Sequence, residues 1–129
     1  DPYDNGAVAA YLGLDGNWVA ASDINRKENI SALEGSLAKV LALNGYSYNF
    51  KRTEAEKADG TQATKVIGVI AQEVAQVIPE VVDIKDNGEH FVSYTEFIPF
   101  LIESIKEQQE QINELRSELQ LLKDFPEAL

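Results

Sequence analysis

Ser22 and Lys27 are the residues of this chain whose types and spacing could do chemistry. A serine hydroxyl attacks a carbonyl carbon once a base removes its proton, and a neutral lysine amine can be that base. An ammonium group cannot accept a proton, so such a lysine must be partly buried or lie near another cation, such as the adjacent Arg26. A plain helix cap at Ser22-Asp23, with Lys27 on a solvated face, is the alternative interpretation. The choice depends on the elements around the pair.

Other catalytic and metal-binding groups are scarce. The chain has no cysteine, which excludes a disulfide framework, a thiol nucleophile and a zinc-thiolate site. His90 is the only histidine, and it lies between a turn signal and an alternating run, so we expect a structural strand residue rather than a member of a catalytic triad. Gln72-Glu73 and Glu89-His90 lack the further ligands that a metal site needs. We therefore expect neither metal nor cofactor.

Composition and charge narrow the class of protein. A length of 129 residues with 44% hydrophobic residues suits one compact domain plus an extended element. The formal charge of −11 argues against binding a nucleic-acid backbone, because there is no cationic excess to release counterions. No run approaches the roughly 20 apolar residues that cross a bilayer. We expect neither nucleic acid nor membrane as a partner.

The first part of the chain predicts a hairpin. Residues 7–12 and 17–20 flank the turn signal Asp15-Gly16. These short strands cannot bury much surface alone. We interpret residues 1–21 as the end of a β-rich upstream stalk that pairs with other chains.

Residues 22–94 predict a small α+β domain of short strands and helices. Ser31 and Glu34 have capping-box spacing ahead of a helix over 32–43, which Asn44-Gly45 should end. Residues 52–64 read as a polar loop, and Asp86-Asn87-Gly88 joins the last two strands as a hairpin. The remaining predicted elements are strands at 46–50, 65–70, 81–84 and 90–94, and a helix at 71–77 closed by Pro79.

Residues 95–123 predict one long helix with a coiled-coil pattern, followed by a tail at 124–129. Apolar residues recur at alternating steps of three and four, which is typical of heptads. Two and three strands both fit, and an amphipathic helix packed on its own domain is the alternative. Gln108 is a polar core residue that can fix register, and Pro99 falls in the first turn, where it is tolerated. The core positions are Ile98, Leu101, Ile105, Gln108, Ile112, Leu115, Leu119 and Leu122.

A series of landmarks runs from Ser22 to about Leu122. They are Ser22-Asp23, Lys27, Ile30, Leu33 and Leu37, Gly45 leading to Phe50, Ile67-Gly68-Val69-Ile70-Ala71-Gln72-Glu73-Val74, Pro79-Glu80-Val81-Val82, Val92-Ser93-Tyr94 and Leu101-Ile102. Each landmark is weak alone, but their order and spacing together are specific. On these residues the chain resembles a known family, the intramolecular chaperone auto-processing domain. That domain ends phage endosialidase tailspikes and other tail fibres and also occurs within myelin regulatory factor.

The resemblance implies a self-cleaving serine endopeptidase that acts once, on its own chain. It implies that Ser22 is the nucleophile, Lys27 its general base and the Ala21-Ser22 peptide the bond that is cut. Asp23 and Arg26 are possible supporting residues.

The resemblance also implies a homotrimer and a biological role. The coiled coil would align three copies of an upstream tail spike or fibre, and the cut would then release residues 22–129. Assembly would take place in the host cytoplasm, with the parent protein in the virion tail. The rival hypothesis is a non-catalytic trimerisation tip that stays on the fibre. A membrane-tethered transcription factor released by the same cut is disfavoured by the lack of a following apolar span.

Overall fold

The computed structural model describes residues 8–128. The chain divides into two compact units, residues 1–32 and 33–129, which are described separately below. Residues 1–7 of the predicted stalk end, including part of the predicted strand at 7–12, lie outside the described residues, as does Leu129 of the tail. The predicted boundaries between the stalk end, the α+β domain, the coiled-coil helix and the tail, at 21/22, 94/95 and 123/124, stay predictions.

The first unit contains the predicted hairpin. Strand β1 (Ala10–Leu12) pairs antiparallel with β2 (Trp18–Ala20), with Tyr11 opposite Val19. Gly16 occupies the turn with a φ of 83°, a conformation that glycine adopts without strain. Asp15 accepts hydrogen bonds from the Asn17 side chain and amide, which lower the pKa of Asp15 below its ordinary value. After β2 the chain forms a 3₁₀ turn, η1 (Ile24–Arg26).

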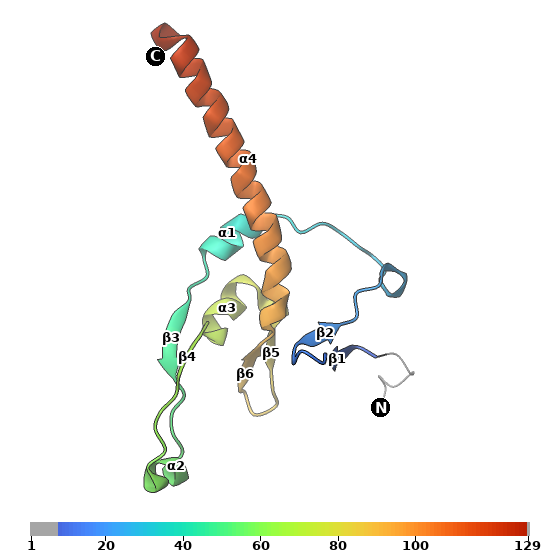
Figure 1. The fold of residues 1–129 in the computed structure, drawn as a ribbon, viewed down its shortest axis with the longest axis vertical. Helices are drawn as coiled ribbons and strands as arrows, with labels where there is room; N and C mark the ends of the chain where they lie inside the picture. The colour runs from blue at the N-terminus through green and yellow to red at the C-terminus, as the bar shows by residue number, and fades with distance from the viewer. Residues whose placement is uncertain (1–7, 129) are drawn as a thin grey trace. The chain divides into compact units, whose positions relative to one another are not determined.

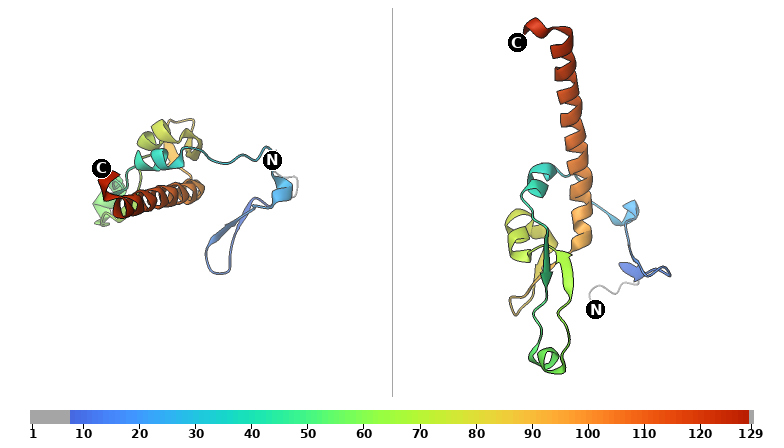
Figure 2. Two further views of the ribbon diagram at one scale, coloured as in Figure 1. Left: turned by 90° about the horizontal axis from the view of Figure 1, so that it is seen from above. Right: turned by 60° about the vertical axis from the view of Figure 1, so that its left-hand side comes forward.

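The second unit is the predicted α+β domain with its long C-terminal helix (Figure 1). It holds two antiparallel hairpins, β3 with β4 and β5 with β6. Figure 2 shows the first hairpin in green, with α2 at its tip. In chain order the elements are α1 (Ser36–Leu41), β3 (Tyr46–Asn49), α2 (Glu54–Asp59), β4 (Lys65–Gly68), α3 (Ala71–Val77), η2 (Pro79–Val81), β5 (Val82–Ile84), β6 (His90–Val92), η3 (Tyr94–Glu96), α4 (Phe97–Asp124) and η4 (Pro126–Ala128).

A small core joins α3, η2 and the start of α4. Val74, Ile78, Val81 and Phe100 form its buried centre, and Ile78 is fully buried. Valines from β5 and β6 pack against this cluster, together with Phe97. The helix predicted at 71–77, the closure at Pro79 and the hairpin at Gly88 are confirmed. The core is small for a domain of this length, and many apolar side chains stay exposed.

The prediction for the first helix of this unit was wrong at its start. Gly35, not Ser31, precedes α1, and its φ of 67° is left-handed, so the helix cannot extend back to residue 32. The amide of Ser36 donates to Glu107 Oε1 on α4 at 3.1 Å. A carboxylate far away in sequence therefore supplies the contact that the predicted Ser31–Glu34 capping box would have made.

The predicted polar loop at 52–64 was also wrong, because it contains α2. Thr53 caps this helix by accepting a hydrogen bond from the Glu56 amide at 3.1 Å, and the Thr53 hydroxyl donates to the Glu56 carboxylate. Gly60, with a φ of 81°, ends the helix. The spacing of Thr53 and Glu56 is itself a capping box, so the signal was present in the sequence.

Close packing holds the end of the β3–β4 hairpin. The Val69 amide donates to the Tyr94 hydroxyl at 3.1 Å. A Cβ atom on Gly68 would overlap the Tyr94 hydroxyl and crowd that of Tyr48 at 3.0 Å. A side chain at position 68 would therefore force the Tyr94 hydroxyl to move and would disturb its bond to the Val69 amide.

Helix α4 has 28 residues, which is about 42 Å at 1.5 Å per residue. Only its first turns pack on the domain, through the buried Phe100 and Ser104. From Gln108 to Asp124 every residue is exposed. The apolar heptad positions lie 40–66% exposed along the helix. Packing on its own domain thus explains only the start of the apolar stripe, and the trimeric coiled coil stays a prediction.

The core makes a quantitative prediction. Replacing Ile78 by alanine should lower the free energy of unfolding by about 2–5 kcal/mol, because it removes buried apolar contacts and leaves a cavity. Ile84→Ala is the matched control, since Ile84 on β5 is 56% exposed. Urea denaturation of both variants at one protein concentration checks this. Equal losses in the two variants would contradict the assignment of the core.

Candidate functional site

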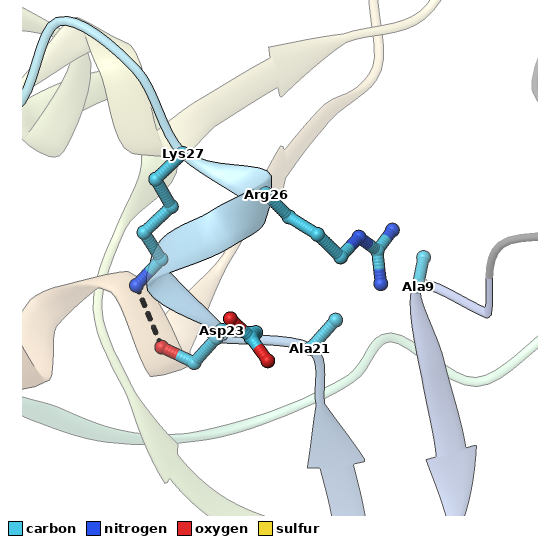
Figure 3. A pocket seen from close by; sticks show the side chains of 6 residues that line it. Ala9, Ala21, Asp23, Arg26 and Lys27 are labelled. Carbon is cyan, nitrogen blue, oxygen red and sulfur yellow. Dashed lines mark hydrogen bonds between the residues drawn. The ribbon is translucent and has the colours of Figure 1, made fainter.

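Ser22 and Lys27 lie in direct contact. Lys27 Nζ donates a hydrogen bond to Ser22 Oγ at 2.7 Å (Figure 3). This polarity suits a charged ammonium group. With a neutral amine the same pair can reverse its hydrogen bond, so that the serine hydroxyl donates to the lysine nitrogen. The reversed arrangement is the one in which a lysine activates a serine.

The local sequence creates this contact through the turn η1. Asp23 Oδ1 accepts a hydrogen bond from the Asn25 amide at 2.8 Å and so caps the turn. The amide of Arg26 donates to the Asp23 carbonyl at 3.0 Å, and that of Lys27 to the Ile24 carbonyl at 3.1 Å. These bonds fold the chain back and bring the Lys27 side chain to Ser22. The Asp23 carboxylate thus supports the pair through the backbone.

Hydrogen bonds join the residues around Ser22 to the two residues that precede β1. Ala21 follows β2, and its amide donates to the Ala9 carbonyl at 2.8 Å. Arg26 reaches the same strand end, because its Nη1 donates to the Val8 carbonyl at 2.9 Å. The Ala21-Ser22 peptide therefore lies at the point where the hairpin ends and η1 begins.

Together these residues line an open hollow of about 220 Å³ within the first unit. Its lining includes residues on both sides of the Ala21-Ser22 peptide, and every lining side chain is exposed. Figure 3 shows the Arg26 side chain extending toward Ala9, while Lys27 points to the other side of the turn. The lining residues are Ala9, Ala21, Ser22, Asp23, Arg26 and Lys27.

The other polar residues singled out in the sequence lie in the second unit, where His90 and Glu73 make structural contacts. His90 lies in β6, with Nδ1 2.8 Å from the Gly88 carbonyl oxygen. Tyr46 donates to both carboxylate oxygens of Glu73, at 2.7 and 3.0 Å, and this bond raises the pKa of Tyr46 above its ordinary value. Within residues 8–128 no group of three or more acidic, histidine or cysteine side chains could hold a metal ion.

A second hollow, of about 400 Å³, was not foreseen from the sequence. It lies in the second unit, and aromatic rings form much of its lining. Burial and the nearby Tyr94 hydroxyl raise the pKa of Tyr48. The alternation of aromatic residues in β3 indicated a half-buried strand but not that β6 would face it. The lining includes Tyr48, Phe50, Gln72, His90, Phe91 and Tyr94.

Comparison with known families identifies the region that contains Ser22 and Lys27. A peptidase family model with the description "Chaperone of endosialidase" matches residues 22–83. These residues belong to the chaperone-of-endosialidase family. The resemblance stated from the sequence is thereby confirmed.

The chain is also similar to phage tail fibre proteins. It is 33% identical over 122 residues to the long tail fibre proteins Gp37 of Enterobacteria phages K3 and T2. The match covers 91% of this chain but only 10% and 9% of those proteins. The corresponding protein of Salmonella phage S16 is 33% identical over 113 residues, which is 84% of this chain and 15% of that protein. The chain therefore spans about a tenth of the first two relatives.

No helix among the described residues is long and apolar enough to cross a membrane.

The cap at Asp23 can be separated from any role of its negative charge. Asp23→Asn keeps an acceptor oxygen for the Asn25 amide, whereas Asp23→Ala removes it. We expect faster amide hydrogen exchange at Asn25 in the alanine variant and near-normal exchange in the asparagine variant, measured by NMR. Equally fast exchange in both would show that the charge, not the cap, holds the turn.

Proposed function

We propose that this chain is the chaperone segment of a phage tail fibre or tailspike and that it separates from the upstream part by self-cleavage between Ala21 and Ser22. The observation that carries the proposal is the 2.7 Å contact between Lys27 Nζ and Ser22 Oγ, beside the peptide that would be cut. The family match supports it, since the matching region begins at Ser22 and the family is one of peptidases.

In the proposed reaction the neutral amine of Lys27 removes the proton from the Ser22 hydroxyl. The oxygen attacks the Ala21 carbonyl carbon, the bond from that carbon to the Ser22 nitrogen breaks, and the nitrogen takes up the proton. The product is an ester between the Ala21 carbonyl and Ser22 Oγ. Water then hydrolyses the ester, which leaves a carboxylate on Ala21 and a free amino group on Ser22.

Activation of Lys27 requires an environment that the first unit does not supply alone. Every side chain that lines the hollow is exposed, and water stabilises an ammonium group. Burial by other copies of the chain would favour the neutral amine. We therefore propose that cleavage follows assembly.

Trimer formation through α4 is the proposed means of assembly. The helix extends well beyond its own domain, and its exposed stripe has an apolar residue at every core heptad position except Gln108. An exposed apolar stripe of this length indicates a partner surface, and matching stripes on identical helices satisfy one another.

The biological advantage follows from the slow folding of fibres. Strands from three chains must meet in one register, and contacts between distant residues form slowly. A C-terminal coiled coil aligns the chains and raises their local concentration, and its later release leaves an upstream trimer that cannot easily unfold by the reverse route. The tail fibre relatives support a place for the mature protein in the virion tail, and we propose that assembly takes place in the host cytoplasm.

The cleavage hypothesis is tested by intact mass spectrometry of the full-length protein. The wild type should give a fragment that begins at Ser22, and Ser22→Ala and Lys27→Ala should stay uncut. Lys27→Arg should also stay uncut, because arginine can donate to Ser22 but cannot accept its proton. Ser117→Ala, on the exposed face of α4, is the matched control and should cleave normally. Wild-type protein that stays uncut as an assembled trimer would leave the rival hypothesis of a permanent trimerisation tip.

A second test addresses assembly through α4. The Ser22→Ala chain should sediment at three times its 14.3 kDa mass, and Ile112→Asp in that background should shift it toward monomer, since a charge is costly in a coiled-coil core. Ser117→Asp introduces the same charge outside the stripe and should leave the trimer intact. Analytical ultracentrifugation checks the masses, and a monomeric parent chain would refute the trimer.

A further inference from the structure

The geometry points to Arg26 as a positioning residue that makes the cut depend on the formation of strand β1. This inference rests on the proposed self-cleavage. Arg26 Nη1 donates to the carbonyl of Val8, a residue that lies 18 positions earlier in the chain, at 2.9 Å. The next residue, Lys27, holds Ser22 at 2.7 Å. Two consecutive side chains of one turn thus hold the nucleophile and the upstream strand.

Two hydrogen bonds, one on each side of the Ala21-Ser22 peptide, join this segment to Val8 and Ala9. The Ala21 amide donates to the Ala9 carbonyl at 2.8 Å, and Arg26 donates to the carbonyl of the residue before it, Val8. Segment 21–26 is therefore attached at both ends to residues 8–9, which lead directly into β1, once through the backbone and once through Arg26. We call this pair of bonds the β1 clamp.

The β1 clamp fixes the orientation of the Ala21 carbonyl, which the turn η1 does not determine. The contact between Ser22 and Lys27 spans five residues across the turn η1 and includes no residue of β1. The direction of the Ala21 carbonyl, unlike the Ser22–Lys27 contact, depends on how the preceding chain enters the turn. Attack requires the hydroxyl oxygen and this carbonyl carbon to be held close together in an aligned geometry, and small misplacements cost large factors in rate.

Arginine suits this position because of its shape. Its planar guanidinium has several donors in a fixed fork and keeps its charge, so it can hold a carbonyl while staying beside the reacting groups. Cleavage would therefore take place only after the upstream strand has paired. A chain whose upstream strand has not paired would have an intact Ser22–Lys27 contact but an unaligned peptide, and would not be cut.

The test is a double-mutant cycle on self-cleavage of the full-length protein. We expect Arg26→Gln to slow cleavage roughly 10- to 100-fold and Arg26→Lys to be intermediate, since a lysine keeps the charge but not the fork. Arg52→Gln is the matched control, because Arg52 also donates to a backbone carbonyl, that of Thr61 at 3.1 Å, but in the second unit. Its rate should match the wild type.

The second arm of the cycle disrupts β1. Tyr11→Pro removes an amide donor from the centre of the strand, and Tyr11→Gly weakens the strand more mildly. If Arg26 acts through β1, Arg26→Gln should cause little further loss in the Tyr11→Pro protein and a reduced loss in the Tyr11→Gly protein. An undiminished loss in both backgrounds, or no loss in the wild type, would overturn the inference.

A measurement without cleavage separates this inference from the proposed function. In the uncut Ser22→Ala protein, Arg26→Gln should speed amide hydrogen exchange at Ala21, whose amide donates to the Ala9 carbonyl just before β1, while Arg52→Gln should not. Unchanged exchange at Ala21 would refute the β1 clamp even if the wild type cleaves. A wild type that never cleaves would instead refute the proposed function, whatever the exchange shows.

Discussion

Packing of Phe100 against Val74, Ile78 and Val81 is the interaction on which the second unit depends. It joins the long helix to the small domain, and it does so with very few buried side chains. Further along α4, Glu107 adds a polar contact by accepting a hydrogen bond from the Ser36 amide at the start of α1. Beyond these turns α4 has no contact with its own domain that buries a side chain. The domain is therefore attached at one end of a helix whose remaining surface is available to other chains.

Elements governed by short-range rules could be predicted from the sequence. The helix at 71–77, the turn at Gly88 and the heptad helix follow from periodicity, glycine and proline, and the structure has them within one or two residues. The start of α1 could not be predicted, because Glu107 supplies its contact from another part of the chain. The helix α2 is a different case, since its capping signal at Thr53 was readable but was outweighed by the polar character of the loop.

The candidate site likewise has contacts that the sequence predicts and contacts that it does not. Ser22 and Lys27 are joined by a single turn of backbone, so their spacing alone brought them together. The contact between Arg26 and Val8 depends on a hairpin between them and left no mark in the local pattern. Exposure of the whole hollow could not be predicted from the sequence either, because it depends on which other parts of the fold cover these side chains.

The two working faces of α4 are set at a fixed angle. Phe100 faces the domain core and Ile105 belongs to the exposed stripe, and five residues of an α-helix correspond to a rotation of roughly 140°. Where such helices meet along the stripe, each small domain must therefore point away from the common axis in a direction fixed by residue count. One residue inserted after Glu107, the last residue of α4 that contacts the domain, would rotate the domain by about 100° relative to the heptad positions from Ile112 onward. In the proposed assembly, the number of residues between the domain contacts and the exposed stripe would therefore set the direction in which each domain points.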